Sequence, residues 1–161
     1  MAFKYPNYLV ETGWLAEHID DSDIRILDCT AFNIPDDNGG IRAESGRESW
    51  EAEHIPGSGH ADLVNDLSDK SAAFRYMLPS VEQFAKAMSG YGVGAATRAV
   101  LYDSTSGSWA TRIWWMLRAF GFDEAYVLNG GLHKWKLENR PVSTSPPNYP
   151  QAIFHARPRT G

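Results

Sequence analysis

The feature that most constrains this chain is an apolar segment that runs directly into a long helical pattern. Residues 98–103 (R-A-V-L-Y-D) are almost continuously apolar, which is typical of a strand covered on both faces of a sheet. The run stops at Asp103, and five small or polar residues follow before an amphipathic helix that is predicted from Ser108 to Phe120. Such a strand–turn–helix unit is typical of parallel α/β sheets, whose ligands bind beyond the carboxyl ends of the strands.

The alternation of strands and helices continues through most of the chain. Strands are predicted at 24–30, 98–103 and 125–129, with shorter candidates at Leu9–Val10 and Ala61–Leu63. Helices are predicted at Glu48–Glu53, after Ser80, at Ser108–Phe120 and at Leu132–Glu138. The Ser80 hydroxyl is expected to accept from the Gln83 amide while the Gln83 side chain reaches back. This order predicts an α/β fold with an open, mostly parallel sheet.

Two regions interrupt the alternation. Residues 33–46 consist of turn formers and charges, and they predict a surface loop. Residues 141–161 contain five prolines and no periodicity, which indicates an extended arm or interdomain linker with nothing to pack against. We therefore expect one domain over residues 1–140, followed by this arm.

Length and charge exclude several classes of protein. The 161 residues suffice for one ordinary domain. The net charge is −5 and the 15 basic residues do not cluster, so nucleic acid is not an expected partner. No apolar run approaches the roughly 20 residues of a membrane span, and the first residues lack a signal-peptide core. The expected location is therefore the cytoplasm.

The turn after the apolar strand is the first candidate site. It consists of Asp103, Ser104, Thr105, Ser106, Gly107 and Ser108. Its amides and the N-terminus of the following helix suit an anion. One interpretation is that the Asp103 carboxylate itself caps these amides. Another makes Asp103 a phosphoryl-accepting nucleophile, but the only later acids are Asp123, Glu124 and Glu138, which do not assemble the required magnesium site.

Three segments together resemble two-domain rhodaneses, the thiosulfate and 3-mercaptopyruvate sulfurtransferases. They are H-I-P-G at 54–57, M-L-P-S-V-E-Q-F at 77–84, and Y-D-S-T-S-G-S-W-A-T-R-I-W-W-M-L-R-A-F-G at 102–121 with V-L-N-G-G-L-H-K-W at 127–135. The resemblance extends from about Val10 to Pro158. It implies a rhodanese-like fold, a five-stranded parallel sheet with helices on both faces.

The turn at Asp103 resembles one half of that family in particular. The C-terminal half carries a cysteine at the start of a six-residue loop, whereas the N-terminal half keeps the loop and typically has an aspartate. The resemblance thus implies an N-terminal domain with a structural and interface role, no persulfide-forming cysteine and no metal or organic cofactor. Its missing partner is the C-terminal catalytic domain, and only the complete enzyme is expected to bind a sulfur donor anion and a thiol or cyanide acceptor. The alternative is a stand-alone, inactive module that binds a protein partner.

Two other residues are weighed for a chemical role. Cys29 ends a predicted strand and is either a displaced nucleophile or a small half-buried hydrophobe. In mercaptopyruvate sulfurtransferases the histidine of H-I-P-G is proposed to assist at the active site, which makes His54 a candidate; otherwise it bonds the following loop. The family also leads us to expect an acidic partner some residues upstream of this histidine, and neither Glu44 nor Ser45 matches that position well. His54 and His60 have too few partners for a metal pair.

The Trp114–Trp115 pair indicates a second surface on the predicted helix. Adjacent helical positions point about 100° apart, so both rings are hard to bury in one core. In the resembling family this region lies near the junction of the two halves, and Arg112 and Arg118 flank the pair. An exposed apolar patch is expected from Trp114 or Trp115 and from Ile153–Phe154, with self-association as its consequence.

Overall fold

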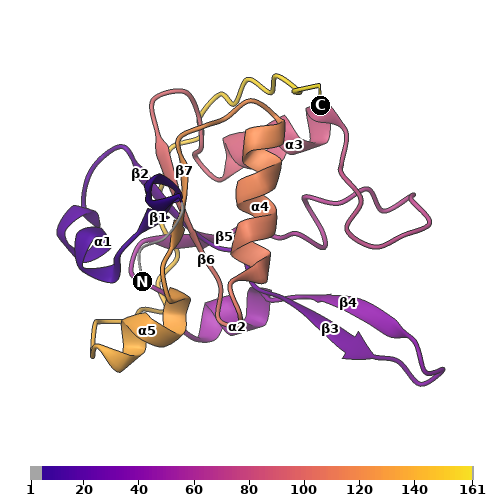
Figure 1. Ribbon diagram of the computed structural model, residues 1–161, viewed down its shortest axis with the longest axis horizontal. Helices are drawn as coiled ribbons and strands as arrows, with labels where there is room; N and C mark the ends of the chain where they lie inside the picture. Colours follow the sequence, from indigo (N-terminus) through magenta and orange to yellow (C-terminus); the bar gives the residue numbers. More distant parts are fainter. Residues whose placement is uncertain (1–4, 161) are drawn as a thin grey trace.

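The computed structural model describes residues 5–160 of the chain (Figure 1). The strands are β1 (Leu9–Val10), β2 (Ile24–Asp28), β3 (Ala31–Pro35), β4 (Ile41–Ser45), β5 (Ser58–His60), β6 (Arg98–Tyr102) and β7 (Ala125–Leu128). The helices are α1 (Thr12–His18), α2 (Arg47–Ala52), α3 (Val81–Gly90), α4 (Ser108–Ala119) and α5 (Gly131–Leu137), preceded by a 3₁₀ turn at Pro6–Tyr8. In the part of the chain described here, no helix is long and apolar enough to cross a membrane.

Five strands form one open sheet in the order β1-β7-β6-β2-β5, and every pairing in it is parallel. The central strand, β6, pairs with β2 through Val100 opposite Ile26 and with β7 through Val100 opposite Tyr126. Parallel neighbours on both sides bury β6 almost completely, which explains its continuous apolar sequence. The predicted parallel five-stranded α/β fold is confirmed.

Helices cover both faces of this sheet (Figure 1), and the strands alternate their side chains between two cores. Leu27 and Leu101 point to the face that α3 and α4 cover, where they join Phe84, Met88, Ile113 and Leu117. Ile26, Val100 and Tyr102 point to the opposite face, where they join Leu15 of α1 and Trp135 of α5. The carboxyl ends of the strands therefore lie on an edge that is held rigidly from two sides.

The prediction of a surface loop at residues 33–46 is wrong, because most of that segment is an antiparallel hairpin. Strands β3 and β4 pair from Ala31 opposite Ser45 to Pro35 opposite Ile41. The Asp36 carboxylate closes the turn by accepting from the amides of Asn38 (2.8 Å) and Gly40 (2.7 Å). The hairpin projects away from the sheet (Figure 1), and nearly all residues of its two strands are exposed or half-buried.

Two local expectations also need correction. The edge strand expected at Ala61–Leu63 lies at Ser58–His60, where small residues pair with β2. Ser80 accepts from the Gln83 amide as predicted (3.1 Å), but the Gln83 side chain does not reach back. It donates instead to the backbone carbonyls of Asp66 (2.9 Å) and Ser68 (3.0 Å) in the preceding loop.

The C-terminal arm packs on the domain, contrary to the expectation that it has nothing to pack against. The amides of Arg157 and Arg159 donate to the carbonyls of Phe120 and Ala119 at the end of α4. Phe154 is only 5% exposed and contacts the rings of Phe84 and Phe122. The burial of Phe154 was not predicted, because the arm has neither helical nor strand periodicity. This side chain nevertheless anchors the arm, which crosses the top of Figure 1.

The expected apolar patch is present only in part. Trp115 is 45% exposed, whereas Trp114 is partly buried and donates its indole N–H to the Ala125 carbonyl at 3.0 Å. In the arm, Ile153 is 71% exposed but Phe154 is buried. The two tryptophans thus face different surroundings, as their adjacent positions predicted.

Replacing the aromatic anchor of the arm tests whether it belongs to the fold. Phe154→Ala should lower the free energy of unfolding by about 3 kcal/mol, because it leaves a cavity between Phe84 and Phe122. Urea denaturation followed by circular dichroism measures the change. The matched control is Ile153→Ala, which removes an exposed neighbour and should cost less than about 0.5 kcal/mol. Equal effects of the two substitutions would contradict the packing described above.

Candidate functional site

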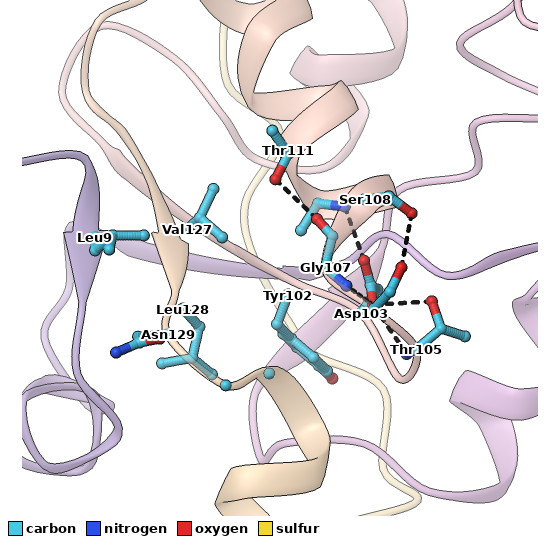
Figure 2. A pocket seen from close by; sticks show the side chains of 14 residues that line it. Leu9, Tyr102, Asp103, Thr105, Gly107, Ser108, Thr111, Val127, Leu128 and Asn129 are labelled. Atoms are coloured by element: carbon cyan, nitrogen blue, oxygen red, sulfur yellow. Dashed lines mark hydrogen bonds between the residues drawn. The ribbon is translucent and has the colours of Figure 1, made fainter. Parts of the chain in front are cut away.

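A pocket of about 520 Å³ opens at the carboxyl ends of β6 and β7, between the first turns of α4 and α5 (Figure 2). Its lining comprises the turn after β6 together with Leu9, Val127, Asn129, Gly130 and Gly131. This is the edge at which open parallel sheets bind ligands. The pocket therefore lies where the sequence predicted the candidate site.

The carboxylate of Asp103 fills the amide cradle at the base of this pocket. Its Oδ1 accepts from the amides of Thr105 (2.9 Å) and Gly107 (3.0 Å) and from the Thr105 hydroxyl (3.1 Å). Its Oδ2 accepts from the Ala110 amide at 3.0 Å, inside the first turn of α4. Gly107 precedes the helix with φ 88° and has no capping side chain, so Asp103 supplies the cap from four residues upstream.

Other residues of the turn hold its outer rim. The Ser104 amide donates to the Thr30 hydroxyl at 3.0 Å, which ties the turn to the end of β2. The hydroxyls of Ser106 and Ser108 lie 3.0 Å apart at the surface. No lysine, arginine, histidine or cysteine lines this pocket in the described part of the chain. The site thus offers hydroxyl groups and a fully hydrogen-bonded carboxylate, but neither a thiol nor a base.

A buried polar network lies beside the turn and was missed in the sequence. The Asp28 carboxylate accepts from the Thr30 amide (2.8 Å) and lies 3.9 Å from Nδ1 of His60. Nε2 of His60 lies 3.5 Å from the Ser45 hydroxyl, which donates to Asp62 at 2.8 Å. Its members come from different elements with no common spacing, so only the fold brings them together.

Burial governs the protonation of this network. It raises the pKa of Asp28 above the ordinary value of a carboxyl, and it lowers the pKa of His60 below that of a free imidazole in spite of the nearby carboxylate. Nδ1 of His60 is buried without a hydrogen-bond partner. Burial therefore shifts both groups toward their uncharged forms.

His54 is completely buried and lies outside the pocket beside Asp103. Its Nδ1 contacts the Trp50 carbonyl at 2.6 Å and its Nε2 contacts the Ser145 carbonyl at 2.7 Å. Both ring nitrogens thus lie within hydrogen-bond distance of a backbone carbonyl. The backbones of His54 and Ser143 also exchange two hydrogen bonds, so this histidine holds the arm against α2.

The upstream acid weighed as a partner of His54 is not available to it. Glu44 pairs with Arg42 on the exposed hairpin at 2.9 Å, and Ser45 belongs to the network around His60. Among residues 5–160, no group of three or more His, Cys, Asp or Glu side chains is arranged to hold a metal ion.

Cys29 has the environment of a core residue. It is completely buried, its thiol lies 3.5 Å from the Leu27 carbonyl, and burial raises its pKa well above that of a free cysteine. The nearby carboxylates of Asp28 and Asp103 act in the same direction. These features are the opposite of those that activate a thiol.

Comparisons with known proteins agree on one family. The family model described as "Rhodanese-like domain" matches residues 11–138. Thiosulfate/3-mercaptopyruvate sulfurtransferase 2 of Arabidopsis thaliana is 35% identical over 152 residues, covering 94% of this chain and 42% of the relative. The 3-mercaptopyruvate sulfurtransferase of Homo sapiens is 35% identical over 155 residues, with coverage of 92% and 50%.

Solved structures give the same result. The crystal structure of SseA from Escherichia coli, which represents the 3-mercaptopyruvate sulfotransferases, superposes on this chain with a TM-score of 0.83 at 32% sequence identity. The match covers 94% of this chain and 56% of that one. This chain thus spans about half the length of the curated relatives it matches.

The buried histidine of the polar network predicts a pH dependence of stability. Because the pKa of His60 is lowered in the folded protein, the unfolded chain binds the proton more readily, and the free energy of unfolding should fall as the pH drops below about 6.5. His60→Gln should weaken this dependence between about pH 7.5 and pH 5.5. Urea denaturation at each pH measures it. His133→Gln, at an exposed position, is the control and should retain the full dependence; equal slopes for His60→Gln and the natural protein would refute the prediction.

Proposed function

This chain belongs to the rhodanese-like family, and we propose that it is the N-terminal half of a two-domain thiosulfate/3-mercaptopyruvate sulfurtransferase, with a structural and interface role. The observation that carries the proposal is the Asp103 carboxylate, which occupies the amide cradle at the strand–helix turn. The relatives, about twice as long as this chain, support the half-enzyme interpretation.

The chemistry of the turn supports an inactive half. A sulfurtransferase of this kind moves sulfane sulfur from a donor anion to a thiol or cyanide through a cysteine persulfide. Converging amides and a helix N-terminus lower the pKa of such a cysteine and hold its anionic forms. Here the carboxylate of Asp103 already accepts from those amides, cannot carry sulfane sulfur and repels a donor anion. Catalysis then belongs to a second, C-terminal domain, without a metal or organic cofactor in this half.

A stand-alone inactive module that binds a protein partner is the second candidate. The exposure of Trp115 and Ile153 favours it, because large apolar side chains at a surface are typical of an interface. Self-association of the isolated chain is expected under either function. A cytoplasmic location, and an assisting role for His54 at the active site of the complete enzyme, remain predictions.

The proposal predicts that the isolated chain does not transfer sulfur. Incubation with thiosulfate should leave Cys29 without the mass of one added sulfur atom, since its thiol is buried and its pKa is raised. Intact-mass spectrometry tests the adduct, and thiocyanate formation from thiosulfate and cyanide tests turnover. Turnover by the unmodified chain would refute the inactive role, and an adduct abolished by Cys29→Ala would show that Cys29 carries the sulfur.

Restoring a cysteine at the turn tests the geometry of the cradle. Asp103→Cys, made together with Cys29→Ala so that one thiol titrates, should have a pKa below the free value of about 8.5, because three amides face it. The lost cap should cost about 1–2 kcal/mol. Turnover should remain slow, since Ser104 stands where the family's catalytic loop has an arginine.

Alkylation by iodoacetamide as a function of pH measures this thiol. The control is Ser106→Cys with Cys29→Ala, which places a thiol on the exposed rim of the same turn and should titrate near the free value. If the two cysteines titrate alike, residues 103–108 do not form an anion cradle and the degenerate-loop interpretation fails.

A further inference from the structure

A second pocket, of about 390 Å³, lies between α4 and the loop that precedes α3. Its polar lining includes Arg75 from the loop and Arg112 from α4, and no aspartate or glutamate contributes to it. Its apolar lining includes Leu63, Met77 and Trp109. Pockets of this size are typical of small-molecule sites.

The two arginines of this pocket differ from most others in the protein. Over residues 5–160, six arginines pair with a carboxylate: Arg42, Arg47, Arg98, Arg118, Arg140 and Arg159. Arg75 and Arg112 form no ion pair there and donate only to backbone carbonyls, those of Ile41 and Tyr76. Two cations without a counter-ion therefore border one cavity, in a chain whose net charge is −5.

Arg112 is the better positioned of the two. Its Nη2 donates to the Tyr76 carbonyl at 2.6 Å, and its guanidinium lies 4.9 Å from the ring centre of Trp115. Its Nε is buried and has no hydrogen-bond partner. Partial burial lowers the pKa of Arg112, since no carboxylate compensates its charge. An anion in the pocket would supply the compensating charge that no carboxylate of the described chain provides to Arg112.

The wall of the pocket is held in a fixed shape. Tyr76 has φ 60°, a left-handed conformation that an aromatic residue rarely adopts. Arg112 holds its carbonyl, Asn33 accepts from its hydroxyl at 2.8 Å, and its ring packs on the edge of Trp109 at 5.3 Å. Strained residues that several contacts hold in place are frequent at binding sites.

We propose that this pocket binds a small oxyanion, a carboxylate or sulfur oxyanion whose other end packs against Leu63, Met77 and Trp109. The guanidinium groups of Arg75 and Arg112 would bind the charged end, because planar N–H donors match two oxygens of such a group. This inference goes beyond the proposed function, since Arg75 and Arg112 line this pocket and not the one beside Asp103, although Ser108 borders both. Its test requires neither a second domain nor turnover.

Isothermal titration calorimetry on the full chain tests the site, with sodium sulfate and sodium pyruvate as separate probes. Sodium chloride at equal ionic strength is the control for each probe. We expect saturable binding with a dissociation constant on the order of 1 mM for at least one probe. The tighter probe identifies the class of oxyanion. Quenching of tryptophan fluorescence should follow the same curve, since Trp109 lines the pocket.

Three variants locate the binding. Arg112→Gln and Arg75→Gln should each weaken it at least about tenfold, because each removes a charged donor. Arg42→Gln, an exposed arginine paired with Glu44 on the neighbouring hairpin, is the control and should leave the affinity unchanged. Thermal unfolding shows whether each variant is folded. If Arg112→Gln does not fold, Arg75→Gln still tests the proposal. Absence of saturation by both probes, full affinity in the folded pocket variants, or an equal loss in Arg42→Gln would overturn the proposal.

Discussion

The hydrogen bonds of one carboxylate hold the functional edge of this domain together. Asp103 ends the central strand, and its side chain accepts from three amides of the following turn and helix. Its backbone carbonyl accepts from the Leu132 amide at the start of α5. A side chain at Gly131 would come within 2.7 Å of that same carbonyl, so the close approach of α5 requires glycine. One residue thus joins β6, α4 and α5.

The electrostatics of this edge follow from where the strands end. Parallel neighbours β2 and β6 bring Asp28 and Asp103 to the same side, and both carboxylates are almost completely buried. Burial is the largest cause of the raised pKa of Asp28, and the nearby carboxylate of Asp103 raises that pKa further. His60 lies close enough to interact but has its own pKa lowered by burial. Burial thus disfavours a positive charge on His60 at this edge, whereas two arginines line the pocket beside α4.

How much could be predicted depends on whether a feature is local. The buried strand, the helix from Ser108 and the Ser80 cap were predictable, because an apolar run, a 3.6-residue period and a capping residue lie within a few positions. The hairpin at 31–45 was missed because turn formers and charges dominate the segment and its two strands are short and largely exposed. Phe154 and the network around His60 were missed because burial there depends on distant elements meeting in the fold. At the turn, the residue types predicted an anion cradle and a carboxylate able to cap it, and the structure confirms that Asp103 does so.

Filling the cradle from within explains how the turn keeps its converging amides satisfied without a bound ligand. Converging amides without an acceptor destabilise a fold unless water or an anion satisfies them. A bound anion loses translational freedom each time it enters, whereas a carboxylate on the adjoining strand is already in place. Asp103 therefore stabilises the turn permanently and blocks it permanently. Under the function proposed above, the aspartate that stands in place of a nucleophile also preserves the scaffold of the turn.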